Sequence, residues 1–177
     1  RPFVRVKLAM SLDGRTAMAS GESKWISSEA SRNDVQRLRA ESSAILTGID
    51  TVLADDPSMN VRFSDPGIAT FRQPKRIVLD SQFKMPADAK IATLAGECMV
   101  YTTVNVDNSA SFPFTIETCE EKNGRIDLHA LLRDLASKEI NLLHVEAGSV
   151  LCGALLKNDL VDEIIIYMAP HIMGDSA

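Results

Sequence analysis

The sequence has no apolar run long enough to cross a membrane. A spanning helix needs about 20 predominantly apolar residues, and no stretch of the chain approaches that length. The first residues, Arg-Pro-Phe-Val-Arg, include neither an apolar core nor a small-residue cleavage site, so they do not form a secretion signal. We therefore expect a cytoplasmic protein without a membrane partner.

Cysteines are few, and basic residues do not predominate. Cys98, Cys119 and Cys152 are widely spaced and form no CxxC pair, which argues against a disulfide scaffold and a structural zinc site. We expect each to be a small buried apolar residue in a reducing compartment. The chain has 19 basic and 24 acidic residues, a net charge of −5, and so lacks the basic excess typical of duplex-binding proteins. No nucleic-acid partner is expected, although a few local arginines could still hold a phosphate.

Metal-ligand spacing and the common dinucleotide fingerprint are also lacking. His129, His144 and His171 are scattered along the chain, and we expect them to be structural or surface residues without a metal. The GxGxxG motif does not occur. A nucleotide site in this chain would have to be built from other turns.

What the sequence does contain is an alternation of strand-like and helix-like segments. The 177 residues suit a single domain. Hydrophobic patterning predicts a helix capped by Ser27 or Ser28 and ending near Ser42, and a polar surface loop over residues 58–73. It also predicts strands over residues 4–10, 44–48, 76–80, 99–103, 114–117, 142–146 and 161–168, and helices over 50–54, 128–138 and 150–157. This order predicts an α/β fold with a mostly parallel central sheet flanked by helices.

The segment from Leu142 to Ala154 is the most informative for chemistry. An apolar strand delivers Glu146 at its carboxyl end, and the turn Ala147-Gly148 opens a helix. Free N–H groups at a helix start can bind a phosphate, and glycine lets a ligand approach the backbone closely. The alternative is an ordinary strand-to-helix connection with glycine as its turn residue.

A second turn, at Gly48, also joins a strand to a short helix. Asp55 falls at the far end of that helix, where the helix dipole disfavours its charge and could suit it for proton transfer. Equally, the run Asp55-Asp56-Pro57 could simply end the helix at the surface. A third segment places the single tryptophan, Trp25, in a loop where it could cover a planar ligand or plug the core.

Four ordered motifs together resemble the reductase domain of riboflavin biosynthesis, 5-amino-6-(5-phosphoribosylamino)uracil reductase. They cover residues 6–17, 21–26, 51–57 and 145–148, and the likeness extends over essentially the whole chain. The resemblance implies a dihydrofolate-reductase-like fold whose last strands are missing here, and NADPH as cofactor. It implies a phosphoribosylaminopyrimidine substrate and a zinc deaminase domain in cis, of which this chain shows no motif. Because the chain starts without Met, we expect an excised single reductase domain, residues 1–177.

The resemblance also implies site residues, position by position. The NADPH site would include Ala9, Trp25, Thr51, Asp55 and Ser81, with Gly148, Ser149, Val150, Leu151, Cys152, Gly153 and Ala154 on the pyrophosphate. The substrate would be held by Ser23, Arg39, Met59, Arg62 and Glu146, the two arginines on its phosphate, although a solvated arginine is the commoner outcome. Catalytic candidates are Asp55, Glu146 and Lys7, with Asp55 slightly preferred as proton donor. One departure is Ala147-Gly148 where many relatives have Gly-Gly, so only Gly148 can adopt a positive φ at low cost.

Two other functions compete with this interpretation. A true dihydrofolate reductase would share the fold, but two arginines and few aromatic residues suit a phosphorylated sugar better than a pterin. A non-catalytic nucleotide-binding or dimerisation module is the second alternative. The apolar segment 161–168 would suit pairing of two subunits, and we expect a homodimer.

Overall fold

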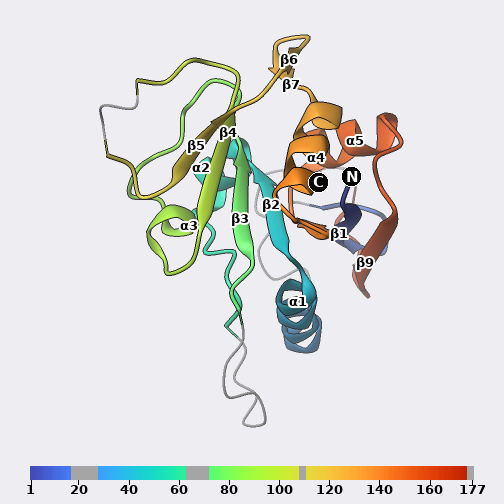
Figure 1. Cartoon of the computed structure of the whole chain (residues 1–177). Helices are drawn as coiled ribbons and strands as arrows, with labels where there is room; N and C mark the ends of the chain where they lie inside the picture. Colours follow the sequence, from blue (N-terminus) through green and yellow to red (C-terminus); the bar gives the residue numbers. More distant parts are fainter. Residues whose placement is uncertain (17–27, 63–71, 108–110, 175–177) are drawn as a thin grey trace.

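A single parallel sheet forms the centre of the molecule. The computed structural model describes residues 1–16, 28–62, 72–107 and 111–174 (Figure 1). Within them, seven strands pair in the order β5-β4-β3-β2-β8-β1-β9, and every neighbouring pair is parallel. The strands are β1 (Phe3–Ser11), β2 (Ala44–Gly48), β3 (Lys75–Leu79), β4 (Cys98–Thr102), β5 (Thr115–Thr118), β8 (Leu142–Val145) and β9 (Glu163–Ala169). The predicted α/β class with a parallel sheet is confirmed.

The described residues include five helices around this sheet. Two of them, α1 and α4, have a polar N-cap residue whose side chain accepts hydrogen bonds from the first N–H groups of the helix. Ser28 Oγ accepts a hydrogen bond from Ser31 N, and Asp127 accepts from His129 N and Ala130 N. None of the described helices combines the length and apolar character needed to cross a bilayer. The helices are α1 (Glu29–Glu41), α2 (Ile49–Asp55), α3 (Lys90–Thr93), α4 (Leu128–Ser137) and α5 (Ser149–Lys157).

Each face of the sheet packs against its own helices because side chains alternate along a strand. On one face, Val6, Leu46 and Val145 pack with residues of α4 and α5, which lie together on that side (Figure 1). On the other face, Ile45 and Val78 pack with residues of α2 and α3. Both faces are therefore buried over the centre of the sheet, as is usual for a parallel sheet.

The observed elements match the predicted ones to within one or two residues, with three additions. Sequence patterning missed α3 and the short hairpin formed by β6 (Glu121–Lys122) and β7 (Arg125–Ile126). The hairpin turn is Asn123-Gly124, and both residues have positive φ, 55° and 74°. Asn-Gly is a strong indicator of a tight hairpin turn, but strands of two residues leave no readable alternation around it.

The strand order determines where a ligand can bind. β8 lies between β1 and β2 although it follows them by about a hundred residues, and Glu146 N donates to Leu46 O at 3.0 Å. The carboxyl ends of β2 and β8 are consequently adjacent. Ligands of open α/β sheets bind beyond such ends, where the strand order switches.

Candidate functional site

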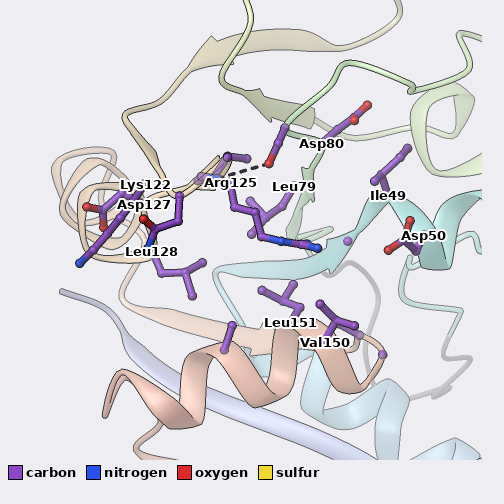
Figure 2. Close-up of a pocket in the computed structure, with 18 of the residues that line it drawn as sticks. Ile49, Asp50, Leu79, Asp80, Lys122, Arg125, Asp127, Leu128, Val150 and Leu151 are labelled. Atoms are coloured by element: carbon purple, nitrogen blue, oxygen red, sulfur yellow. Dashed lines mark hydrogen bonds between the residues drawn. The ribbon is translucent and has the colours of Figure 1, made fainter.

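The turns at Gly48 and Gly148 face one cleft of about 860 Å³. Its walls come from the carboxyl ends of β2, β3 and β8, the start of α5 and the β6–β7 hairpin (Figure 2). The two turns that the sequence analysis singled out separately therefore meet at one cleft. Seven of the predicted cofactor residues line it: Thr51, Ser81, Gly148, Ser149, Val150, Leu151 and Ala154.

The start of α5 is open toward a ligand. Gly148 is the N-cap residue, and no side chain caps the helix. Gly148 has a φ of −70°, so the turn does not use the left-handed conformation that glycine alone adopts cheaply. A Cβ built on Gly148 would meet no atom within 4 Å. The fold therefore leaves space at this glycine, next to N–H groups that can bind an anion.

A buried ion pair lies directly behind this turn. Arg39 of α1 donates to both carboxylate oxygens of Glu146, Nε to Oε1 at 2.5 Å and Nη2 to Oε2 at 2.9 Å. Its remaining nitrogen donates to Asn60 O at 3.1 Å. Arg39 is only 8% exposed, so the alternative of a solvated arginine is wrong at this position. The bidentate geometry fixes Glu146 at the carboxyl end of β8.

Glu146 is held in its ionised form. Burial by itself raises the pKa of Glu146, but the Arg39 guanidinium and His144 outweigh burial and bring the pKa well below its usual range. His144 Nε2 lies 3.4 Å from Glu146 Oε1, and the imidazole is completely buried. Sequence reasoning missed His144 as a neighbour of the site. Its position two residues before Glu146, on the same face of the strand, is the feature that could have identified it.

Lys7 lies on the same face of the sheet as this pair. Burial lowers the pKa of Lys7, the Glu146 carboxylate opposes that change, and the Arg39 guanidinium adds to it, so that the net pKa is lowered. Its Nζ is 5.8 Å from the centre of the Tyr167 ring, on β9. The Tyr167 hydroxyl in turn donates to Asp34 Oδ2 at 2.6 Å. This hydrogen bond connects β9 to α1.

A second, shallower hollow of about 510 Å³ opens beside Arg39 and contains Met59 and Arg62. Three predicted substrate residues therefore share one space. Met59 is buried and has a φ of +42°, a left-handed conformation that costs a residue with a side chain about 1–2 kcal/mol. The loop is held in place by Gln73, whose side-chain amide bonds both Val61 N and Val61 O, at 2.8 and 2.9 Å.

Other predicted residues lie outside the two hollows. Asp55 is exposed at the end of α2 and lines neither hollow, whereas Asp56 lies at the rim of the second and binds Lys90. Cys152 packs into the core and Gly153 is exposed on α5. Ala9 lies on β1, where it pairs with Tyr167 of the neighbouring strand β9. Ser23 and Trp25 fall outside the described residues.

Metal binding has no support in the part of the chain that the structure describes. No group of three or more His, Cys, Asp or Glu side chains is arranged there to hold an ion. The three cysteines are free thiols, two of them buried and Cys119 half-buried. Burial raises the pKa of the Cys98 thiol to about 11, which makes it an inert apolar side chain rather than a ligand.

The comparisons with known proteins agree with the family resemblance predicted from the sequence. The family model described as the RibD C-terminal domain matches residues 2–177. The riboflavin biosynthesis protein RibD of Escherichia coli (strain K12) is 46% identical over 186 residues, which cover 99% of this chain and 50% of that protein. The 5-amino-6-(5-phosphoribosylamino)uracil reductase of Buchnera aphidicola (subsp. Acyrthosiphon pisum, strain APS) is 37% identical, covering 90% of this chain and 81% of that protein.

Solved structures extend the likeness to three dimensions. Acinetobacter baumannii RibD, form 2, superposes with a TM-score of 0.87 at 42% identity, covering 99% of this chain and 48% of that one. The chain spans about half the length of the RibD relatives that it matches. By its sequence and its fold, the chain belongs to the RibD C-terminal domain family.

Proposed function

We propose that this chain, as one reductase domain, uses NADPH to reduce the ribosyl group of 5-amino-6-(5-phosphoribosylamino)uracil to the ribityl product in riboflavin biosynthesis. The observation that carries the proposal is the convergence of the Gly48 and Gly148 turns on one cleft, with the Glu146 ion pair directly behind Ala147. A dinucleotide cleft beside buried cations suits hydride transfer to an anionic substrate. The printed name of the Buchnera relative supports the choice of substrate.

The lining of the cleft fits a nicotinamide dinucleotide. The uncapped N–H groups at Gly148 suit the pyrophosphate, and the hydroxyls of Thr51 and Ser81 can bond to ribose or phosphate oxygens. Leu79 and Leu151 offer apolar contact to the flat rings. When bound, the cofactor supplies the hydride, and the protein orients the two partners.

The substrate would occupy the space between the ion pair and the second hollow. Arg39 is already bonded to Glu146 and Asn60, so its role would be to hold the carboxylate toward the substrate. Arg62 is exposed in the same hollow. Among the described residues its guanidinium bonds only the Ser58 hydroxyl, so Arg62 is the better ligand for the ribose phosphate. Ser23 stays a proposed substrate residue on the resemblance alone.

Among the three catalytic candidates, Lys7 is the best proton donor. Glu146 has a depressed pKa and is held ionised by Arg39, so it is a poor acid. None of the three lines either hollow, but Asp55 is exposed at the end of α2, whereas Lys7 is half-buried beside the Glu146 ion pair. Burial lowers the pKa of Lys7 toward the working range, which suits an acid that gives its proton as the hydride arrives. Glu146 would hold a sugar hydroxyl. As C1 of the ribose gains a hydride and its bond to the ring oxygen breaks, Lys7 would give a proton to that oxygen, which becomes a hydroxyl of the ribityl chain.

Substrate-dependent oxidation of NADPH tests this proposal. The purified protein should oxidise NADPH when 5-amino-6-(5-phosphoribosylamino)uracil is added, and the product should carry a ribityl chain by mass spectrometry. Oxidation with dihydrofolate instead would favour the dihydrofolate reductase alternative. NADPH binding without oxidation by either compound would favour a non-catalytic nucleotide-binding module.

The wider setting follows from the relatives and is proposed with the activity. One solved relative, from Thermotoga maritima, is named as a deaminase and reductase together, so we propose a deaminase domain in cis. The cytoplasmic location expected from the sequence stays a prediction. We also propose a homodimer. Alternate side chains of the edge strand β9, Ile164, Ile166 and Met168, are 43%, 47% and 53% exposed, which forms an apolar stripe suited to a second copy.

A further inference from the structure

The β6–β7 hairpin forms one wall of the cleft and presents an arginine to it. Arg125 lines the cleft, and Figure 2 shows its side chain extending into the cleft, with Leu79 on one side and Leu151 on the other. No hydrogen bond or ion pair of the Arg125 guanidinium is found among the described residues. An arginine that reaches into a ligand cleft without a partner is placed to receive an anion from that ligand.

Three aspartates also line the cleft, Asp50, Asp80 and Asp127. Asp127 caps α4 by accepting from His129 N and Ala130 N. Asp80 is fully buried and accepts from Met85 N at 2.7 Å through Oδ2, while its Oδ1 has no hydrogen-bond partner. Asp50 lies in the first turn of α2. Among the described residues, none of the three aspartates forms an ion pair with Arg125, so its positive charge is left for a ligand.

The sheet order indicates which part of a dinucleotide lies near Arg125. The Gly48 and Gly148 turns end the two central strands β2 and β8. Lys7 lies on β1, on one side of this pair, so with Lys7 as the proposed proton donor the hydride-donating ring would lie toward β1. On the other side, β3 ends at Leu79, and Ser81 follows it in the next turn; the Ser81 hydroxyl accepts from Ile126 N at 3.2 Å and ties the hairpin to that end of the sheet. The adenosine half of the dinucleotide must then extend toward β3 and the hairpin.

We infer that Arg125 binds the 2′-phosphate on the adenosine ribose and sets a preference for NADPH over NADH. The inference rests on the proposed function and specifies which residue selects the cofactor. The pyrophosphate charge is met at the start of α5, whereas the 2′-phosphate needs a cation on the adenosine side. The planar guanidinium matches phosphate geometry with two parallel hydrogen bonds, which a lysine cannot reproduce.

Binding measurements test the inference without relying on turnover. Kd values for NADPH and NADH are measured by fluorescence titration for the wild type, Arg125→Ala, Arg125→Lys and Arg133→Ala. Arg133 is a control because it is an exposed arginine of α4 that does not line the cleft. Arg125→Ala should weaken NADPH binding about 10- to 100-fold, the range for a lost hydrogen bond to a charged group, and leave NADH binding within about twofold.

The alternatives give different patterns. Arg125→Lys should recover part of the NADPH affinity, and Arg133→Ala should match the wild type for both dinucleotides. Equal weakening of NADPH and NADH in Arg125→Ala would place the arginine on the pyrophosphate or adenine and overturn the inference, as would unchanged NADPH binding. The wild-type protein tests the cofactor, and the variant tests the residue. If the wild type prefers NADPH but Arg125→Ala contradicts the inference, the proposed cofactor still stands. Wild-type protein that binds neither dinucleotide overturns the proposed function and this inference together.

Discussion

Lys7, Glu146 and Arg39 are three charged side chains that share one largely buried space. Two of them, Arg39 and Glu146, neutralise each other through two hydrogen bonds. The third charge, on Lys7, has no hydrogen-bonded partner among the described residues, and burial lowers its pKa. A half-buried charge without such a partner destabilises a fold, so the presence of Lys7 beside the ion pair is better explained by chemistry than by stability.

Replacing Lys7 should separate activity from stability. Lys7→Met should lower turnover about 10²- to 10⁴-fold, the usual contribution of a positioned acid. Because the pKa of Lys7 is lower in the folded state than the unfolded value of 10.5, its charged form opposes folding at neutral pH. The thermal midpoint of the variant should therefore equal or exceed that of the wild type.

The matched control for this prediction is Lys75→Met. Lys75 starts β3 at the opposite end of the sheet and pairs with Glu97 at 2.8 Å. This variant should keep wild-type turnover. If Lys7→Met also keeps it, Lys7 is not the proton donor.

The ion pair makes stability depend on acid pH. The folded-state pKa of Glu146 lies below its unfolded value of 4.5, so the carboxylate stabilises the fold above that pH and loses this contribution as pH falls below it. In Glu146→Gln the free energy of unfolding should change less between neutral pH and about pH 3 than in the wild type. Urea denaturation over this range measures both slopes, and equal slopes would contradict the low pKa.

At the scale of elements, the turn that opens α5 is the proposed binding site for the pyrophosphate. Its glycine is not required by backbone conformation, since Gly148 has a negative φ and open space at the Cβ position. The residue at an N-cap is usually Ser, Thr, Asp or Asn, because their side chains satisfy the first N–H groups. An uncapped start leaves those groups for a ligand.

A serine at this position should help the helix and harm the site. In Gly148→Ser the new hydroxyl should cap α5, so the thermal midpoint should not fall. The same hydroxyl would occupy the N–H groups meant for the pyrophosphate, and the Kd for NADPH should rise about tenfold, the loss of one charge-assisted hydrogen bond. Tighter or unchanged binding, measured by titration, would show that the cofactor does not use this turn.

The elements of this fold differ in how far the sequence predicts them. The long strands and helices could be predicted because apolar residues repeat with a clear period over five or more residues. The β6–β7 hairpin could not, since its strands are only two residues long and only Asn123-Gly124 marks it. This hairpin supplies Arg125 to the cleft, so a part of the site was missed together with it.

At the scale of the whole molecule, the site depends on contacts between distant parts of the chain. Arg39 and Glu146 are 107 positions apart and meet only because β8 inserts beside β2. Neither residue's local pattern predicts this pairing or the burial of Arg39. The motif resemblance identified both residues as substrate ligands, but the ion pair and the neighbouring His144 required the strand order.

The apolar stripe on β9 gives a prediction for the assembly. Ile166→Lys should shift a dimer toward monomer by light scattering, because a charge at its centre would have to be buried between the copies. Leu53→Lys is the control: Leu53 is 52% exposed on α2, far from β9 in Figure 1, and should leave the assembly unchanged. A wild type that is monomeric at all concentrations would contradict the proposed homodimer.

The crystal structure of the NADPH complex tests the central claim most directly. The account predicts that the pyrophosphate contacts the N–H groups at the start of α5, with the Gly48 turn on its other side. It also predicts the nicotinamide toward Lys7 and the adenosine toward the β6–β7 hairpin. A dinucleotide bound elsewhere on the molecule, or one that contacts only one of the two turns, would contradict it.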